Sequence, residues 1–377
     1  MLKDTKFDEI RPYYDEEIAD AMHRIAENEL FYPVSAYIYP ENDVDFVRNE
    51  LKKCRTIDEF QSKFMSKANE EIIKRSIRKF TFGGLEALDT EKKYLFVSNH
   101  RDIVLDAMLF QYILWQKGHK TSQITFGNNL MSSHFVIDIG RSNKMFKVIR
   151  GGNMKDFYRN SLLLSQYIAH TLHTNNESVW ISQRNGRTKD GIDATDQGII
   201  KMFYMFSPEN AVESLASLNL VPVSISYFWE TNDRMKAHER CISALNGSYK
   251  KADGEDLRSI LEGISQYKGD VHIQCGKIIT EKDLLPLADL PNNKFNAAVA
   301  SLIDKEIRNN YKLFPTNFIA FDLRNGSDAY ENVRYSLEEK ALFLQRMNGF
   351  VADYGENRKL FEEKFIDIYA NPVLNCL

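Results

Sequence analysis

The sequence predicts an α/β fold, a sheet flanked by helices, with a helical extension at each end of the chain. From about residue 91, short runs of β-branched and aromatic residues alternate with amphipathic helical stretches. This alternation is typical of a sheet that helices cover on both faces. Towards both ends of the chain, apolar residues recur at three- and four-residue intervals, which indicates helices. The chain has 377 residues and is 43% hydrophobic, enough for one large core or two smaller ones.

The predicted order of elements follows from these patterns. Residues 1–90 are expected to form a helical N-terminal segment with a Pro- and Asn-bearing loop at 32–43. Residues 91–282 are expected to form the α/β domain, and residues 283–377 a helical C-terminal extension. The strands expected in the α/β domain are 94–98, 124–127, 178–182, 220–227 and 271–276. The helices expected between them are roughly 103–117, 141–149, 154–174, 195–206 and 255–265.

The net charge and the positions of the cysteines limit the binding partners and the cellular compartment that we expect. A net charge of −4 and a pI near 6.1 give no general attraction to nucleic acid, so an anionic ligand needs a local basic patch. The four cysteines lie far apart without a CxxC pair, so neither a disulfide framework nor a metal site is indicated. The start of the chain is charged, and no apolar run approaches the ~20 residues of a spanning helix. We therefore expect a cytoplasmic protein that meets a membrane only by lying on its inner face.

The most informative segment is YLFVSNHRDIVLD, in which a buried strand ends just before His100 and a helix begins soon after. A His at the carboxyl end of such a strand faces the crevice where α/β proteins usually bind ligands. A carboxylate that accepts a proton from one ring nitrogen leaves the other nitrogen free as a base. Asp106, in the first turns of the helix, is the favoured partner. Asp102 is the alternative partner, although it also lies where a helix N-cap would.

The HRD within this segment is typical of a kinase catalytic loop, but the rest of that motif is missing. A kinase needs Asn five residues after the Asp, where this chain has Ala107, and no DFG or Gly-rich phosphate loop occurs. A GxSxG elbow and a Walker lysine loop are also absent from the sequence. A kinase is therefore excluded, as are the commonest classes of serine hydrolase and P-loop protein.

Two further segments carry cations beside glycines. In MFKVIRGG, Arg150 ends an apolar run, and in WISQRNGRTKDG a predicted strand is followed by Asn185, Gly186, Arg187 and Lys189. Guanidinium groups bind phosphate bidentately, and glycine-rich loops let backbone N–H groups approach the same oxygens. Together the two segments predict an anion site, although either alone is compatible with a solvated turn.

The order of these segments, closed by VPVSISY with Pro222, resembles the glycerol-phosphate and lysophosphatidate acyltransferases, the PlsC-like family, over about residues 91–230. SNHRDIVLD looks like the NHxSxxD block of that family. The resemblance implies a glycerolipid acyltransferase-like sheet, with His100 as base and Asp106 as its partner. It also implies that Arg150, Gly186 and Arg187 meet the phosphate of the acceptor.

The sequence departs from the family at two places. The family has four residues between His and Asp, whereas five separate His100 from Asp106, and one residue turns a helix by about 100°. Either the helix begins one residue later here, or Asp102 has taken the partner role. The family also has a Glu where this chain has Asn185, and an amide supplies no charge.

The resemblance implies transfer of a fatty acyl group from acyl-CoA or acyl-carrier protein, as co-substrate rather than cofactor, to a hydroxyl of glycerol phosphate, lysophosphatidate or a related lipid. Its expected partners are the acyl thioester donor, the glycerolipid acceptor and a membrane surface met peripherally, with no nucleic acid. Two alternatives stay open: a non-catalytic lipid-binding protein on the same fold, and a thioester hydrolase. The apolar residues of the helix at 103–117 either line an acyl groove or belong to the core, and the core is favoured.

Overall fold

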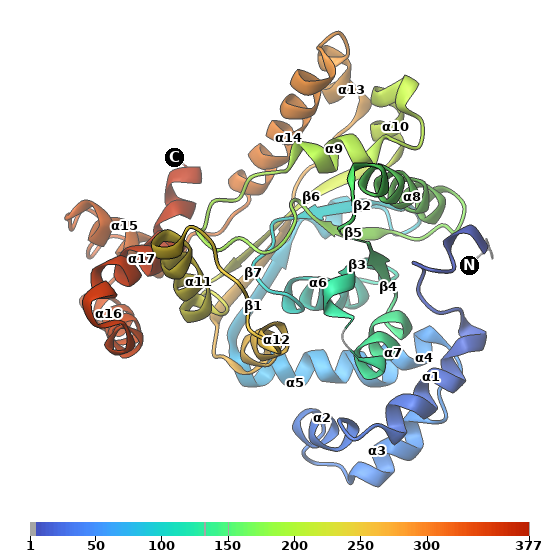
Figure 1. Cartoon of the computed structure of the whole chain (residues 1–377), viewed down its shortest axis with the longest axis horizontal. Helices are drawn as coiled ribbons and strands as arrows, with labels where there is room; N and C mark the ends of the chain where they lie inside the picture. The colour runs from blue at the N-terminus through green and yellow to red at the C-terminus, as the bar shows by residue number, and fades with distance from the viewer. Residues whose placement is uncertain (1–4, 132, 150, 377) are drawn as a thin grey trace.

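A seven-stranded sheet forms the centre of the computed structural model, which describes residues 5–131, 133–149 and 151–376 (Figure 1). The strand order is β1-β7-β6-β2-β5-β3-β4. From β6 to β4 neighbouring strands are parallel, whereas β7 runs antiparallel to β6 and pairs with β1 in parallel. The carboxyl ends of β2, β3, β4, β5 and β6 therefore lie along one edge of the sheet. The strands are β1 (Ile77–Gly83), β2 (Leu95–Ser98), β3 (Gln123–Gly127), β4 (Met145–Val148), β5 (Val179–Ser182), β6 (Leu220–Tyr227) and β7 (Gly269–Cys275).

Helices cover both faces of this sheet and form a further layer at each end of the chain (Figure 1). Before the sheet come α1 (Asp15–Glu27), α2 (Phe31–Ile38), α3 (Val44–Leu51), α4 (Ile57–Phe60) and α5 (Ser66–Ser76). Between strands lie α6 (Leu105–Gln116), α7 (His134–Ser142), α8 (Met154–His173), α9 (Gln197–Phe203), α10 (Ala211–Ser217), α11 (Asp233–Asn246) and α12 (Glu255–Ser265). After β7 follow α13 (Glu281–Leu284), α14 (Asn292–Asn309), α15 (Pro315–Asn325), α16 (Leu337–Val351) and α17 (Arg358–Cys376).

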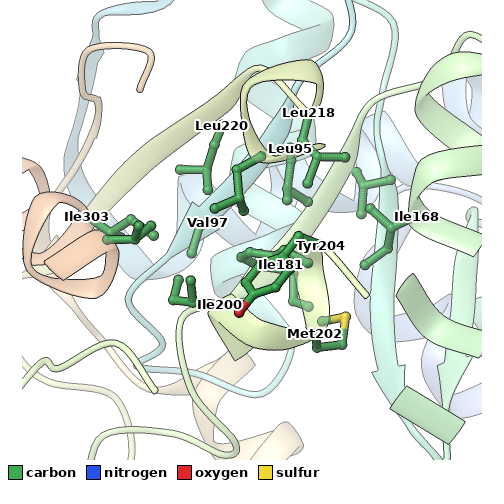
Figure 2. Packing of buried hydrophobic residues seen from close by; sticks show 14 of the residues in the cluster. Leu95, Val97, Ile168, Ile181, Ile200, Met202, Tyr204, Leu218, Leu220 and Ile303 are labelled. Atoms are coloured by element: carbon green, nitrogen blue, oxygen red, sulfur yellow. The ribbon is translucent and has the colours of Figure 1, made fainter. Parts of the chain in front are cut away.

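Alternate residues of the central strands point into two separate cores, because successive side chains of a strand face opposite sides of a sheet. Leu95 and Val97 of β2 pack with residues of α8, α9 and α14, as Figure 2 shows for Ile168, Ile200 and Ile303. Phe96, between them on the same strand, faces the buried side of α6 on the other face of the sheet. β2 is thus held from both sides, and this fixes where the chain emerges at its carboxyl end.

The two chain ends form clusters of their own. The helices α1 to α4 pack together with Phe135 of α7. The last helices, α15, α16 and α17, pack against α11 through a buried cluster that contains Ala237 and Phe343. The fold is therefore the predicted α/β sheet with helical regions at both ends.

Several predicted boundaries differ from the structure. The predicted helix at 141–149 is wrong, because α7 ends at Ser142, Lys144 takes a positive φ of 60°, and the following residues form β4 beside β3. The sheet begins before residue 91, since β1 pairs with β7, a contact between distant segments that local periodicity does not reveal. The predicted loop at 32–43 is helical up to Ile38, because α2 spans Phe31–Ile38. Beyond residue 282, α14 still covers the sheet, with Ile303 in its core.

The loop that follows β5 is held against the last helix. The Asn371 side chain donates to the Asp190 carbonyl at 2.7 Å, and the Asn375 side chain donates to the Gly191 carbonyl at 3.0 Å. Gly191 has a φ of +77°, and a Cβ there would lie 2.3 Å from the Ile368 carbonyl oxygen. The loop can therefore approach α17 this closely only with glycine at position 191.

We predict that Gly191→Ala destabilises the protein more than Gly247→Ala. Both glycines have a φ of +77°, but a Cβ at Gly247 meets no atom within 4 Å. The two variants share the cost of a left-handed backbone, about 1–2 kcal/mol, and only Gly191→Ala adds a clash, worth about 1–3 kcal/mol. Urea unfolding of both variants measures the difference. Equal free energies of unfolding would contradict the close packing of this loop on α17.

Candidate active site

His100 follows β2 at the edge where the parallel strands end, and its ring is hydrogen-bonded to Asp106. The His100 Nδ1 and Asp106 Oδ2 atoms are 2.8 Å apart. The His100 side chain is 15% exposed, while that of Asp106 is fully buried. The other ring nitrogen is the one left to reach a substrate, since Nδ1 is occupied by the carboxylate.

Asp106 is surrounded by hydrogen-bond donors. Its Oδ2 also accepts from the backbone N–H groups of Arg101, at 2.6 Å, and Asp102, at 2.9 Å, and its Oδ1 accepts from the Tyr227 hydroxyl at 2.8 Å. Burial by itself would raise the pKa of Asp106, but the interactions with His100 and the two backbone donors outweigh it and lower the pKa. Because the carboxylate is ionised and only accepts, the imidazole must carry its proton on Nδ1, which leaves Nε2 as a base.

The structure separates the two aspartates that the sequence leaves as alternatives. Asp102 Oδ1 accepts from the backbone N–H groups of Val104, at 3.0 Å, and Leu105, at 2.9 Å, at the start of α6. Asp106 lies in the first turn of α6, which begins at Leu105, and its carboxylate reaches back to His100. Asp102 therefore binds the backbone N–H groups at the start of α6, two residues before the N-cap residue Val104, and Asp106 is the hydrogen-bond partner of His100.

Several buried, charged side chains surround Arg101, the residue that follows His100. Arg101, with no exposed side-chain surface, forms an ion pair with Asp193 and a longer contact of 3.5 Å with Glu230. The Lys236 ammonium donates to Glu230 Oε1 and to the Arg101 carbonyl, both at 2.6 Å. The Thr188 backbone N–H donates to the His100 carbonyl at 2.7 Å. The backbone carbonyl groups of His100 and Arg101 are therefore held by residues from the β5 loop and from α11.

The third predicted segment, after β5, lies next to this group. Asn185 is exposed and Gly186 has a φ of +74° with open space beside it. Arg187 donates to the Ser259 hydroxyl of α12 at 2.8 Å, and Lys189 forms an ion pair with Glu239 of α11. The two cations are thus tied to elements that follow β6 in the chain.

The second predicted segment is described in part. Arg150 lies outside the described residues, while its neighbours Ile149, Gly151 and Gly152 line a cavity of about 720 Å³ at the start of α8. A larger cavity, of about 740 Å³, lies between the N-terminal helices and residues that precede β3, β4 and β5, and Trp115 of α6 helps to line it. His100 and Arg187 line neither of these two cavities.

The alternative roles of the helix at 103–117 are resolved by burial. Leu105, Met108, Leu109, Phe110, Ile113 and Leu114 are all buried, and Trp115 is 44% exposed. All but Trp115 belong to the core on the α6 face of the sheet. These side chains are therefore core, as favoured from the sequence.

Within residues 5–131, 133–149 and 151–376, no three His, Cys, Asp or Glu side chains gather closely enough to hold a metal ion. In the same part of the chain, no helix combines the length and hydropathy needed to cross a bilayer.

Sequence reasoning missed three residues that complete the site. Tyr227, Thr188 and Lys236 come from β6, the β5 loop and α11, and each contacts the segment 100–106. Tyr227 ends VPVSISY, a segment already singled out for Pro222, which pairs with Val97 in the sheet. The strand order places β6 beside β2, and this order was the missing information.

A buried carboxylate that holds an imidazole at the carboxyl edge of an α/β sheet is an arrangement that can act as a general base. Residues 79–226 match the family described as Acyltransferase. This part of the chain therefore matches an acyltransferase domain, in agreement with the resemblance seen in the sequence. No curated protein matches the chain. Among solved structures, it is similar to the 1-acyl-sn-glycerophosphate (LPA) acyltransferase PlsC from Thermotoga maritima, with 13% identity over 76% of this chain and 94% of that chain and a TM-score of 0.38.

We predict that the stability contributed by Asp106 depends on pH. Because its pKa is lowered in the folded protein, the ionised carboxylate stabilises the fold fully above its unfolded value of about 3.9. That contribution is lost as the pH falls through the lower folded value. Urea unfolding between pH 7 and pH 3 should show the wild type more stable than Asp106→Asn at neutral pH, with the difference shrinking in acid.

The exposed Asp20 of α1 provides a control, since Asp20→Asn should leave the free energy of unfolding nearly unchanged across this range. A difference between the wild type and Asp106→Asn that stays constant from pH 7 to pH 3 would mean that folding does not lower the pKa of Asp106.

Proposed function

We propose that this acyltransferase is a glycerolipid O-acyltransferase of phospholipid biosynthesis. It transfers a fatty acyl group from acyl-CoA or acyl-carrier protein to a hydroxyl of glycerol phosphate, lysophosphatidate or a related lipid acceptor. The observation that carries the proposal is the 2.8 Å hydrogen bond between His100 and the buried Asp106, inside a segment that matches the family.

In the proposed reaction, His100 Nε2 takes the proton of the acceptor hydroxyl as the hydroxyl oxygen attacks the thioester carbonyl carbon. The C–O bond forms, the tetrahedral oxyanion collapses, and the C–S bond breaks to release the thiolate. The imidazolium, stabilised by Asp106, then returns its proton to the thiolate. A thiol with a pKa of about 8.5 is a good leaving group, so the reaction needs one base and no acyl-enzyme.

In the proposed acceptor site, residues of the loop after β5 would bind the anionic phosphate of the acceptor. Arg187 is partly exposed and its described partner, Ser259, is neutral. Lys189 is already paired with Glu239. We therefore propose Arg187 as the main contact to the acceptor phosphate in this loop, with Gly186 allowing close approach of the backbone and Asn185 contributing hydrogen bonds. Arg150 stays a proposed phosphate contact from the sequence.

A lipid acceptor requires access from a membrane, and we propose that the start of α8 meets its inner, cytoplasmic face. Met154, Phe157 and Tyr158 are 88%, 67% and 59% exposed, an unusual concentration of large apolar side chains. They recur at the spacing that puts them on one side of a helix. α8 follows β4, whose carboxyl end shares the sheet edge of His100. The exposed Lys155 beside them would favour anionic lipids.

The rival function, a non-catalytic lipid-binding protein, rests on two features of the sequence. The first was the spacing of His100 and Asp106, which the hydrogen bond between their side chains accommodates. The second was Asn185, which is exposed on the loop. Thiol release that depends on an acceptor separates transfer from binding, and thiol release without any acceptor indicates a hydrolase.

We predict that His100→Ala lowers acceptor-dependent thiol release by on the order of 10²–10⁴-fold, the usual contribution of a general base. A thiol-reactive dye and mass spectrometry of the lipid product measure the reaction. His23→Ala, on the exposed surface of α1, is the control and should keep wild-type activity. Wild-type rates in the His100→Ala protein would exclude this residue as the base.

We predict that Phe157→Ser together with Tyr158→Ser reduces sedimentation with vesicles of phosphatidylcholine and phosphatidylglycerol. Loss of exposed apolar area removes the driving force for entering the interface. The variant should keep its rate on a water-dispersed, short-chain acceptor. Leu337→Ser serves as control, because Leu337 is 61% exposed on α16, at the other end of the molecule. Unchanged sedimentation of the double variant would show that the membrane contact lies elsewhere.

A further inference from the structure

Tyr227, the last residue of β6, contacts the carboxylate that is hydrogen-bonded to the proposed base His100. Its hydroxyl donates to Asp106 Oδ1 at 2.8 Å, and its side chain is 1% exposed within the core on the α6 face of the sheet. Tyr227 therefore makes contact with the imidazole only through Asp106 among the described hydrogen bonds.

The two oxygens of Asp106 are held in different ways. Oδ2 accepts hydrogen bonds from the imidazole and from two backbone N–H groups, whereas Oδ1 accepts one from the Tyr227 hydroxyl. A carboxylate can turn about its Cβ–Cγ bond, a torsion with broad preferences. The donor on Oδ1 opposes that rotation and keeps Oδ2 in line with His100 Nδ1.

Tyr227 acts as a donor and not as a second base. Burial raises the pKa of Tyr227 well above its usual value, and the negative charge of Asp106 raises it further. The phenol thus stays protonated across the range in which a histidine titrates. Its hydrogen bond to an ionised partner is of the stronger, charge-assisted kind.

We propose that Tyr227 is a positioning residue, which acts through Asp106 to hold the His100 imidazole in the orientation and tautomer needed for acyl transfer. This inference rests on the proposed function in that it names the residue that sets the base of the same site. Without the hydroxyl, Oδ1 is a buried oxygen with no described donor, and the carboxylate is free to turn away from the ring.

The first test replaces the hydroxyl alone. Tyr227→Phe should lower kcat by about 10- to 100-fold, the range expected for one hydrogen bond to a charged group, with KM within about twofold of the wild type. Tyr94→Phe is the matched control, because Tyr94 is also 1% exposed in the same core, and its hydroxyl bonds to the backbone of Asp89 before β2, away from the site. An unchanged kcat in Tyr227→Phe would overturn the proposal.

A double-mutant cycle with Asp106→Asn separates positioning from general damage. If Tyr227 acts through the carboxylate, adding Tyr227→Phe to Asp106→Asn should lower kcat by less than about twofold. A structural defect would instead multiply the two losses. Multiplied losses would therefore overturn the proposal even if Tyr227→Phe alone is slow.

A third measurement does not depend on activity, so that failure of the proposed function is distinguishable from failure of this inference. NMR of protein with ¹⁵N-labelled histidines reports which ring nitrogen of His100 carries the proton, and the His100 signals are assigned by their absence in His100→Ala. Tyr227→Phe should move the ring from the Nδ1–H tautomer towards a mixture of both tautomers, because the carboxylate is free to turn away from Nδ1, while Tyr94→Phe should leave the tautomer unchanged. An unchanged tautomer in Tyr227→Phe would overturn the inference, whether or not acyl transfer is found.

Discussion

The charge of the Asp106 carboxylate, buried with no exposed surface, is the constraint on which the site depends. An ionised group removed from water is costly unless donors replace its hydration. Here the donors come from two separate parts of the chain: the loop after β2, which includes His100, and the carboxyl end of β6. They meet only if β2 and β6 are neighbours in parallel register, as the pairing of Leu95 with Leu220 shows. The hydrogen-bonding requirement of one buried carboxylate therefore links the strand order to the position of His100, the proposed base.

The network of buried polar contacts around His100 extends beyond the part of the chain that matches the family. Glu230 and Lys236, which follow β6, hold the Arg101 side chain and carbonyl. Glu230 in turn donates its backbone N–H to the Tyr369 hydroxyl of α17, at 3.1 Å. Tyr369 and Arg346 both hydrogen-bond to the buried Asp233 at the start of α11. The C-terminal helices are thus joined to the loop that carries His100 through buried polar contacts, although they carry no recognisable chemistry in their sequence.

The strongly patterned parts of the fold were predictable. The strand over Leu220–Tyr227 and the helix over Glu255–Ser265 have the predicted bounds, because each combines a clear apolar pattern with turn residues at its ends. β1 and β4 were missed, since both lie at the outer ends of the sheet order and depend on one neighbour each. The sequence located His100 and Asp106 through local spacing, whereas Tyr227 required knowledge of which strands are adjacent.

The contacts of the basic side chains also distinguish residues that the sequence analysis could treat only as one basic cluster. In a protein of net charge −4, a cation attracts an anionic ligand only to the extent that its charge is not already balanced. Lys189 is balanced by Glu239, and Arg101 is buried between Asp193 and Glu230. Arg187 donates its hydrogen bond to a serine hydroxyl, which carries no charge, and is therefore the cation that we propose to meet the ligand. Because that hydroxyl belongs to α12, the helix beyond the family segment sets the direction in which Arg187 points. In the proposed function, α12 would then influence acceptor recognition, whereas His100 and Asp106 both lie within the segment that matches the family.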